Sequence, residues 1–177
     1  MQRTSIALLL ACTGFMTQAH ASDGTISFTG QVSTSTCTIS VAGSGNNGSI
    51  SLPPISTKAL AASLATAGAT PFSISLSGCT GSATQAAIWF ENDANVTAAG
   101  RLVNSGTASN VDVAIYNTSS STHIPIGQTS TTFGSSGTAF SISSGSATLH
   151  YLARYYANGQ ATAGTVSANV NYTVQYQ

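Results

Sequence analysis

The sequence predicts an all-β protein, and more closely a β-sandwich, from three observations. Apolar and polar residues alternate with a period of two in several short runs, which is the pattern of half-buried strands. Clusters of Gly, Ser and Asn separate these runs, and such residues favour turns. No long stretch repeats apolar residues at the period of an amphipathic helix. Short strands between turns are typical of two packed sheets.

Residues 1–21 are expected to be a secretory signal peptide. Arg3 makes the start positive, residues 6–16 are mostly apolar, and Ala19-His20-Ala21 is a small-x-small cleavage site. Lipoprotein processing before Cys12 is the alternative, but it would leave a very short apolar stretch. The mature chain then has 156 residues, enough for one domain with a core. No other run is apolar over a membrane-spanning length, so no span is expected.

The mature chain is almost uncharged. Only 5% of all residues are charged, and acidic and basic residues nearly balance. Nucleic acids and anionic membranes are bound by clustered Lys and Arg, so neither is an expected partner. The abundance of Ser, Thr, Ala and Gly can indicate disorder, but disordered chains are usually charged and poor in β-branched residues. Here Val, Ile, Thr and aromatic residues recur in alternating runs, so strands are expected.

Two cysteines remain after the signal peptide, Cys37 and Cys79. An exported protein with an even number of cysteines normally pairs them. A disulfide would close a loop of about 40 residues and stabilise the fold by roughly 4 kcal/mol in the chain-entropy model. The alternative is a pair of separate buried thiols.

The first half of the mature chain is expected to begin with two strands, at residues 24–32 and about 32–42. The apolar parity of these two runs differs, which implies a bulge or break between them. Residues 50–52 form a short strand that Pro53 and the proline after it stop. The Ala-rich residues 58–70 form either one helical turn or an ordered loop.

Further alternating runs follow, each ended by a turn cluster. They lie at residues 72–76, 86–91, 111–115, 124–126, 140–142 (weak), 149–155 and 166–176. No repeat and no Pro/Ser-rich linker divides the chain, so one domain is expected.

The two ends of the mature chain carry strands without evident partners. The run at residues 24–32, called the N-terminal segment below, has one apolar face. That face consists of Ile26, Phe28, Gly30 and Val32. The last run stops at Gln177 with no strand after it. If the two ends belong to different copies of the chain, the copies form a polymer; the alternative is that the segment pairs within its own sandwich.

Few residues are available for catalysis. His123 and His150 are isolated, so no metal site is expected. Glu91 and Asp93 could be a glycosidase pair, but neither further acids nor an aromatic subsite surround them. There is no nucleophile elbow after an apolar strand, and the Gly-rich residues 43–48 lack a phosphate-binding Lys. We therefore predict no catalytic residue, no metal and no cofactor, and expect that the chain is not an enzyme.

Four motifs follow one another along the mature chain. They are Gly-x-Ile-x-Phe-x-Gly-x-Val at 24–32, Ser-Thr-Cys-Thr-Ile-Ser-Val at 35–41, Pro-Phe-Ser-Ile-Ser-Leu-Ser-Gly-Cys at 71–79, and Arg-Tyr-Tyr-Ala at 154–157 with a closing strand that has a penultimate Tyr. In this order they resemble the major subunits of chaperone-usher fimbriae, the type 1 and type 3 pilins. The resemblance covers the whole mature chain, although residues 80–140 match only in character.

This resemblance implies an incomplete immunoglobulin-like β-sandwich that lacks its last strand and is completed by a donor strand from another subunit. Residues 1–21 would be the signal peptide, 22–33 the N-terminal donor-strand extension and 34–177 the pilin domain. The donor residues that enter successive pockets map onto Ile26, Phe28, Gly30 and Val32, with Gly30 at the shallow pocket. The final strand, which flanks the acceptor groove, maps onto Val166, Val170, Tyr172, Val174 and Tyr176, and Gln177 supplies the carboxylate gripped by the chaperone.

The implied function is that of a structural subunit that polymerises by donor-strand exchange into a surface fibre used for adhesion. The implied partners are identical or related pilin subunits, a periplasmic chaperone, an outer-membrane usher and a host or surface receptor. The protein would pass through the periplasm to a fimbria on the cell surface. A monomeric secreted binding module, for instance a carbohydrate-binding one with Trp89 as its platform, is the alternative. A small exported hydrolase is not favoured, because the chain lacks the catalytic residues of one. A two-domain tip adhesin is not favoured either, because the chain has an N-terminal donor and no room for a receptor domain.

Overall fold

The computed structural model describes residues 25–119, 121–127 and 139–177, so the expected signal peptide lies outside the described residues. Contacts divide the chain between Val32 and Ser33, and the unit Ser33–Gln177 is called the body below. None of the helices described is long and apolar enough to cross a membrane.

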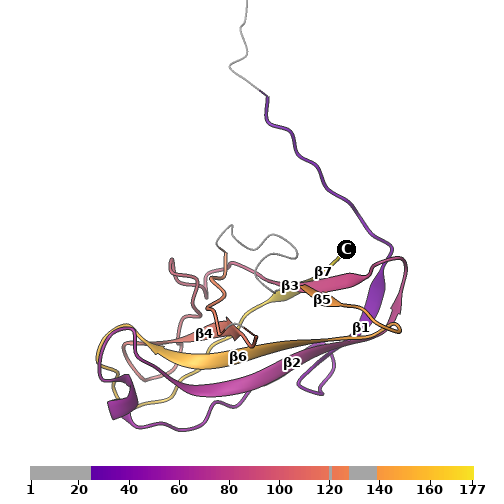
Figure 1. Cartoon of the computed structure of the whole chain (residues 1–177). Coiled ribbons are helices and arrows are strands. Elements are labelled where there is room, and N and C mark those ends of the chain that lie inside the picture. Colours follow the sequence, from indigo (N-terminus) through magenta and orange to yellow (C-terminus); the bar gives the residue numbers. More distant parts are fainter. Residues whose placement is uncertain (1–24, 120, 128–138) are drawn as a thin grey trace, which may run out of the picture. The chain divides into compact units, whose positions relative to one another are not determined.

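The body consists of two antiparallel sheets, which confirms the all-β prediction (Figure 1). One sheet has the strand order β1-β2-β6-β4, and the other has the order β5-β3-β7. The strands are β1 (Thr36–Val41), β2 (Thr66–Thr80), β3 (Gln85–Phe90), β4 (Val111–Asn117), β5 (Ala139–Ser141), β6 (Ala147–Ala157) and β7 (Tyr172–Tyr176). Strands β1 and β7 therefore each lie at the edge of their sheet.

The core lies between the sheets and is organised around Tyr151. Alternate residues of β6 are buried, as its period-two pattern predicts. The Tyr151 ring lies 5.5 Å from that of Phe72 in β2 and 5.4 Å from that of Phe90 in β3. Because its contacts come from both sheets, this side chain joins the two layers. Burial raises the pKa of Tyr151, and the nearby Ile88 backbone only partly offsets this.

The first half of the chain departs from the predicted strands at three places. The N-terminal segment has no regular secondary structure over its described residues, and β1 begins only at Thr36. Residues 50–52 also form no strand. The Ala-rich stretch, for which the sequence left a helical turn or a loop open, begins with a single 3₁₀ turn, η1 (Thr57–Leu60). Strand β2 then starts at Thr66, well before the strand predicted at residues 72–76. The chain between Val32 and β1 forms no strand, and a register shift lies inside β1 itself, between Thr36 and Thr38.

Two strands predicted in the second half are shorter than expected. Residues 124–126 form no regular strand, although the Ile124 amide donates to the Ile115 carbonyl of β4 at 2.9 Å. The last run is a strand only from Tyr172 onward. Residues 165–167 bond instead with the loop at 104–108, for example from the Ser105 amide to the Ser167 carbonyl at 2.8 Å. Residues 165–167 therefore form with this loop the main-chain hydrogen bonds that they would otherwise form in a regular sheet.

Candidate functional site

Among the residues that the structure describes, β7 pairs with β3 alone, and its outer edge presents main-chain groups that point away from that strand. Gln85 and Gln177 exchange two main-chain hydrogen bonds, of 2.9 and 3.0 Å. Because such bonds alternate along an antiparallel pair, the odd-numbered residues of β7 bond with β3. The amides and carbonyls of Tyr172, Val174 and Tyr176 therefore face outward. An edge of this kind is a template for one more strand.

Strand β1 presents a second edge in the same way. The Ala42 amide donates to the Ser73 carbonyl of β2 at 2.9 Å, so the even-numbered residues at this end of β1 bond with β2. The main-chain groups of Ile39 then face away from β2.

Two tyrosine side chains of β7 reach across to β1 and the loop after it. The Tyr172 hydroxyl donates to the Asn46 carbonyl at 2.7 Å. Burial raises the pKa of Tyr176, and the nearby backbone of Cys37 partly offsets this increase. Burial also raises the pKa of Tyr172. Strands β1 and β7 therefore lie close together although they belong to different sheets. We call this side of the body, bounded by β1 and β7, the open edge.

The open edge is apolar and only partly covered. All five apolar residues that the sequence assigns to the acceptor strand are half-buried and pack against the core. The structure brings them together with Ala168 and, from β1, with Cys37 and Ile39. The residues of the acceptor row are Val166, Ala168, Val170, Tyr172, Val174 and Tyr176. Sequence reasoning missed Ala168, although its parity matches, because an alanine gives a weak apolar signal.

The chain end is held at one end of β7. The Gln177 carbonyl accepts main-chain hydrogen bonds from Thr84 at 2.7 Å and from Gln85 at 2.9 Å. Close by, the Ala83 amide donates to the Ser35 hydroxyl at 3.2 Å. The last residue and the first residues of the body thus lie at the same end of the molecule, which we call the base.

The N-terminal segment exposes the large side chains of its predicted apolar face. Ile26 is 80% exposed, Phe28 is 90% exposed and Val32 is fully exposed. A Cβ at Gly30 would meet no atom within 4 Å. Large apolar side chains exposed together on one strand-like segment are unusual in a soluble protein and indicate a surface that becomes buried against a partner.

The predicted disulfide is confirmed, since Cys37 and Cys79 are bonded across a separation of 42 residues. It joins β1 to β2 beside the register shift, where the ladder itself is irregular. The bond thereby fixes the start of the strand that bounds the open edge.

Removing the disulfide is expected to destabilise the body by about 4 kcal/mol in the chain-entropy model. The double variant Cys37→Ala with Cys79→Ala avoids an unpaired thiol, and urea unfolding measures the loss. The subunit yield should fall before any assembly step is affected. Finding two free thiols by intact mass in exported wild-type protein would contradict this assignment.

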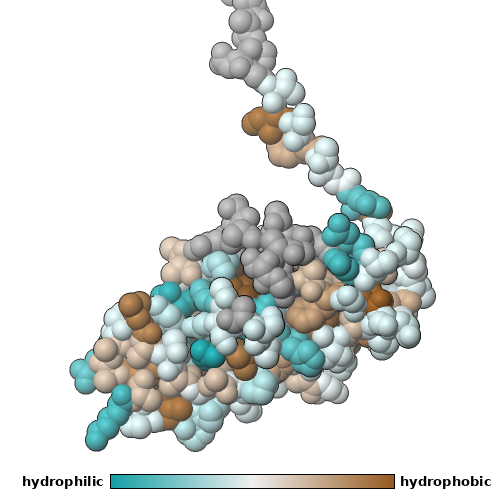
Figure 2. All heavy atoms as spheres, in the orientation of Figure 1, coloured by the Kyte–Doolittle hydropathy of each residue, from teal (hydrophilic) through white to brown (hydrophobic). Residues whose placement is uncertain are grey.

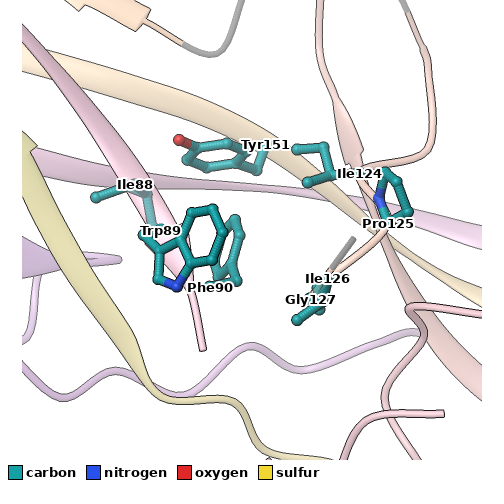
Figure 3. A pocket seen from close by; sticks show the side chains of 8 residues that line it. All are labelled: Ile88, Trp89, Phe90, Ile124, Pro125, Ile126, Gly127 and Tyr151. Atoms are coloured by element: carbon teal, nitrogen blue, oxygen red, sulfur yellow. The ribbon is translucent and has the colours of Figure 1, made fainter. Parts of the chain in front are cut away.

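One small pocket lies beside Tyr151 of the core (Figure 3). It is lined by Ile88, Trp89, Phe90, Ile124, Pro125, Ile126, Gly127 and Tyr151, and its volume is about 10 Å³. That volume holds about one water molecule, so the pocket is too small for a sugar ring. Trp89 is half-buried rather than an open platform. The pocket therefore gives no support to the carbohydrate-binding alternative.

The few polar candidates are used in local structure. Glu91 accepts a hydrogen bond from the Thr173 hydroxyl at 2.6 Å, and Asp93 accepts one from the Asn95 amide at 2.8 Å. His123 is half-buried beside the Tyr116 ring, and burial lowers its pKa. Within the described ranges, no group of three or more His, Cys, Asp or Glu side chains is placed to hold a metal ion.

Comparison with known proteins gives a consistent result. A family model described as "Fimbrial protein" matches residues 26–177. The chain is 36% identical to the F17 fimbrial protein of Escherichia coli over 100% of both chains. It is 39% identical to the major fimbrial subunit SMF-1 of Stenotrophomonas maltophilia, over 89% of this chain and 95% of that one. The P pilus rod subunit PapA has the same fold, with a TM-score of 0.58 over 80% of this chain and 99% of that chain at 18% identity.

Proposed function

Because the chain belongs to the fimbrial protein family and is a structural subunit of a surface fimbria, we propose that its copies polymerise by donor-strand exchange. In this mechanism the N-terminal segment of one copy lies along the open edge of another and completes its sandwich. The partners of each subunit are then related pilin subunits.

The observation that carries the proposal is the match between these two parts of the chain. The open edge offers outward-facing main-chain groups and a row of half-buried apolar side chains. The N-terminal segment offers the alternating sequence of a strand and three large apolar side chains that are exposed. Pairing would form a ladder of hydrogen bonds and bury those side chains, at roughly 1.5 to 3 kcal/mol each. Dissociation should be correspondingly slow.

The direction in which the donor segment inserts follows from where each direction would place the body of the next subunit. If the donor ran parallel to β7, its Val32 would lie near Gln177, and every body would meet its neighbour base to base. If it runs antiparallel, Val32 lies near Val166, and the next body begins at the end opposite the base. Only the antiparallel arrangement gives a head-to-tail contact, which generates an open filament.

The pathway to the surface is part of the same proposal. A periplasmic chaperone would cover the open edge before assembly and grip the carboxylate of Gln177, and an outer-membrane usher would exchange chaperone for donor. The half-buried apolar row supports the need for such a cover, since an uncovered apolar edge strand promotes aggregation. A host or surface receptor stays a prediction for the fibre, and the proposal gives the subunit no catalytic role.

Purified fimbriae are expected to run on a detergent gel as a ladder of multimers when unheated, and to collapse to one subunit band on heating. The ladder reflects strand insertion without covalent links. Reductant without heat is the control and should leave the ladder in place, because the cystine lies within one chain. A ladder that survives heat but collapses with reductant would show that cross-linking, not strand exchange, holds the subunits together.

A further inference from the structure

Leu64 is a large apolar residue displayed at the surface by an unfavourable backbone. Its side chain is 73% exposed and its φ is 72°, in the left-handed region that favours Gly or Asn. Main-chain bonds on either side fix this geometry. The Leu64 amide donates to the Ala157 carbonyl at 2.8 Å, and the Ala157 amide donates to the Ala65 carbonyl at 2.9 Å. A smaller residue would fit the turn better, so the side chain itself needs an explanation.

The surroundings of Leu64 are suited to contact with another protein. Ala59, Ala61 and Ala62 are exposed beside it in sequence, and Lys58 is the one charged residue of η1. In Figure 2 the end of the body that carries η1 shows hydrophobic and weakly hydrophobic surface, interrupted by hydrophilic residues. Alanine offers little bulk, so Leu64 projects from a flat apolar surround.

This patch lies at the end of the body opposite the base. Strand β2 begins at Thr66, just after Leu64, and ends at Thr80, which pairs with Thr36 at the start of β1. A strand of 15 residues spans roughly 45 Å. The Ala161 amide donates to the Leu60 carbonyl at 3.0 Å, so the chain leading into the acceptor row also starts from the Leu64 end.

We propose that Leu64 packs against the base of the next copy in the fibre. This inference rests on the proposed antiparallel donor-strand exchange, which places the Val32 of the incoming segment near Val166. The body attached to that segment therefore begins at the Leu64 end. One occupant, a second copy of this chain, thus reaches the patch as a consequence of the same insertion.

The base is a suitable counterpart because it exposes a group of small residues. Ser33, Gly81 and Ser82 are exposed and near one another, since Ser35 bonds with Ala83. Small side chains let an aliphatic side chain approach the main chain closely. The contact would set the angle between successive bodies, which the donor strand alone leaves free to hinge between Val32 and the base.

The variant Leu64→Asn tests the contact without harming the fold. Asn tolerates a positive φ, so the isolated subunit should unfold at the same temperature as the wild type or higher. Fibres of the variant should release subunits in warm detergent about tenfold faster, from the loss of a buried leucine at the interface. Ser121→Asn is the matched control, since Ser121 is exposed with a φ of 52° near the end of β4, on the side away from the open edge. Equal release by variant and wild-type fibres would overturn the proposal.

Cross-linking tests the geometry directly. The double variant Leu64→Cys with Ser82→Cys places thiols at opposite ends of one body, too far apart to join within it. A short thiol-reactive cross-linker should therefore join neighbouring subunits in assembled fibres and give heat-resistant multimers, but none in dilute monomers. Pairing Ser121→Cys with Ser82→Cys should give none in either sample. Fibres that form, pass the heat-collapse test and still fail to cross-link would refute the Leu64 contact while leaving strand exchange intact; wild-type fibres that fail the heat-collapse test would refute the exchange itself.

Discussion

Moving residues 24–33 to a position after Gln177, through a short Gly-containing turn, is expected to convert the polymerising chain into a soluble monomer. The segment can then run back antiparallel along β7 and fill the open edge of its own body. A short linker gives a high effective concentration, commonly in the millimolar range, so the attached segment should outcompete the segment of any neighbour. The product should fold without a chaperone and remain monomeric in size-exclusion chromatography.

The expected gain in stability is large. Three buried apolar side chains contribute roughly 5 to 9 kcal/mol before ordering costs, which is comparable to the whole free energy of unfolding of an ordinary domain. For a domain of this size each kcal/mol shifts the melting temperature by about 2 to 4 °C, so the moved segment should raise it by more than about 10 °C. The reference for this comparison is the same chain with the segment simply deleted.

The deleted chain also decides between the two hypotheses. It should aggregate or melt at low temperature, because β1 and β7 then keep an uncovered apolar edge. A deleted chain that is monomeric and as stable as the rearranged one would show that the sandwich is already complete. The secreted binding module would then replace the pilus subunit as the better interpretation.

The substitution Phe28→Asp is expected to abolish incorporation into fibres, by a factor of 100 or more. Phe28 is the largest side chain on the apolar face of the N-terminal segment and is 90% exposed before assembly. An unpartnered carboxylate in an apolar site costs several kcal/mol, in addition to the lost burial of the ring. Co-expression of tagged variant and untagged wild type, followed by quantification of the tag in purified fibres, measures the effect.

Two variants serve as controls for Phe28→Asp. Thr29→Asp places the same charge on the neighbouring residue, whose side chain points to the opposite face of the strand, so it should incorporate nearly normally. Phe28→Leu keeps the site apolar and should reduce incorporation only a few-fold. Gly30→Leu should block assembly if the facing position is shallow. Normal incorporation of Phe28→Asp would show that this face of the segment is not the donor face.

Local pattern was enough to predict some elements closely and others poorly. The period-two runs around Tyr151 and Ile88 became β6 and β3 almost as predicted, because each alternation reports one buried face. Residues 124–126 and 166–170 alternate equally well and yet are not regular strands. The Ile126 amide donates to the Gly100 carbonyl and the Ser105 amide donates to the Ser167 carbonyl, so both runs bond in part with loops. No periodicity reveals the shape of a partner distant in sequence.

The sequence by itself determined that the chain is all-β, that Cys37 pairs with Cys79, and that both ends of the mature chain carry an apolar face with no evident partner strand. These are properties of composition and local parity. Only the tertiary structure decided that β1 and β7 are edge strands that bound the same side of the body, with the Tyr172 hydroxyl of β7 reaching the loop after β1. It also decided that Leu64 stands exposed on a left-handed backbone at the end opposite Gln177. Strand order and end-to-end placement arise from pairings between residues far apart in the chain, and alternation along one strand carries no information about which strand lies beside it.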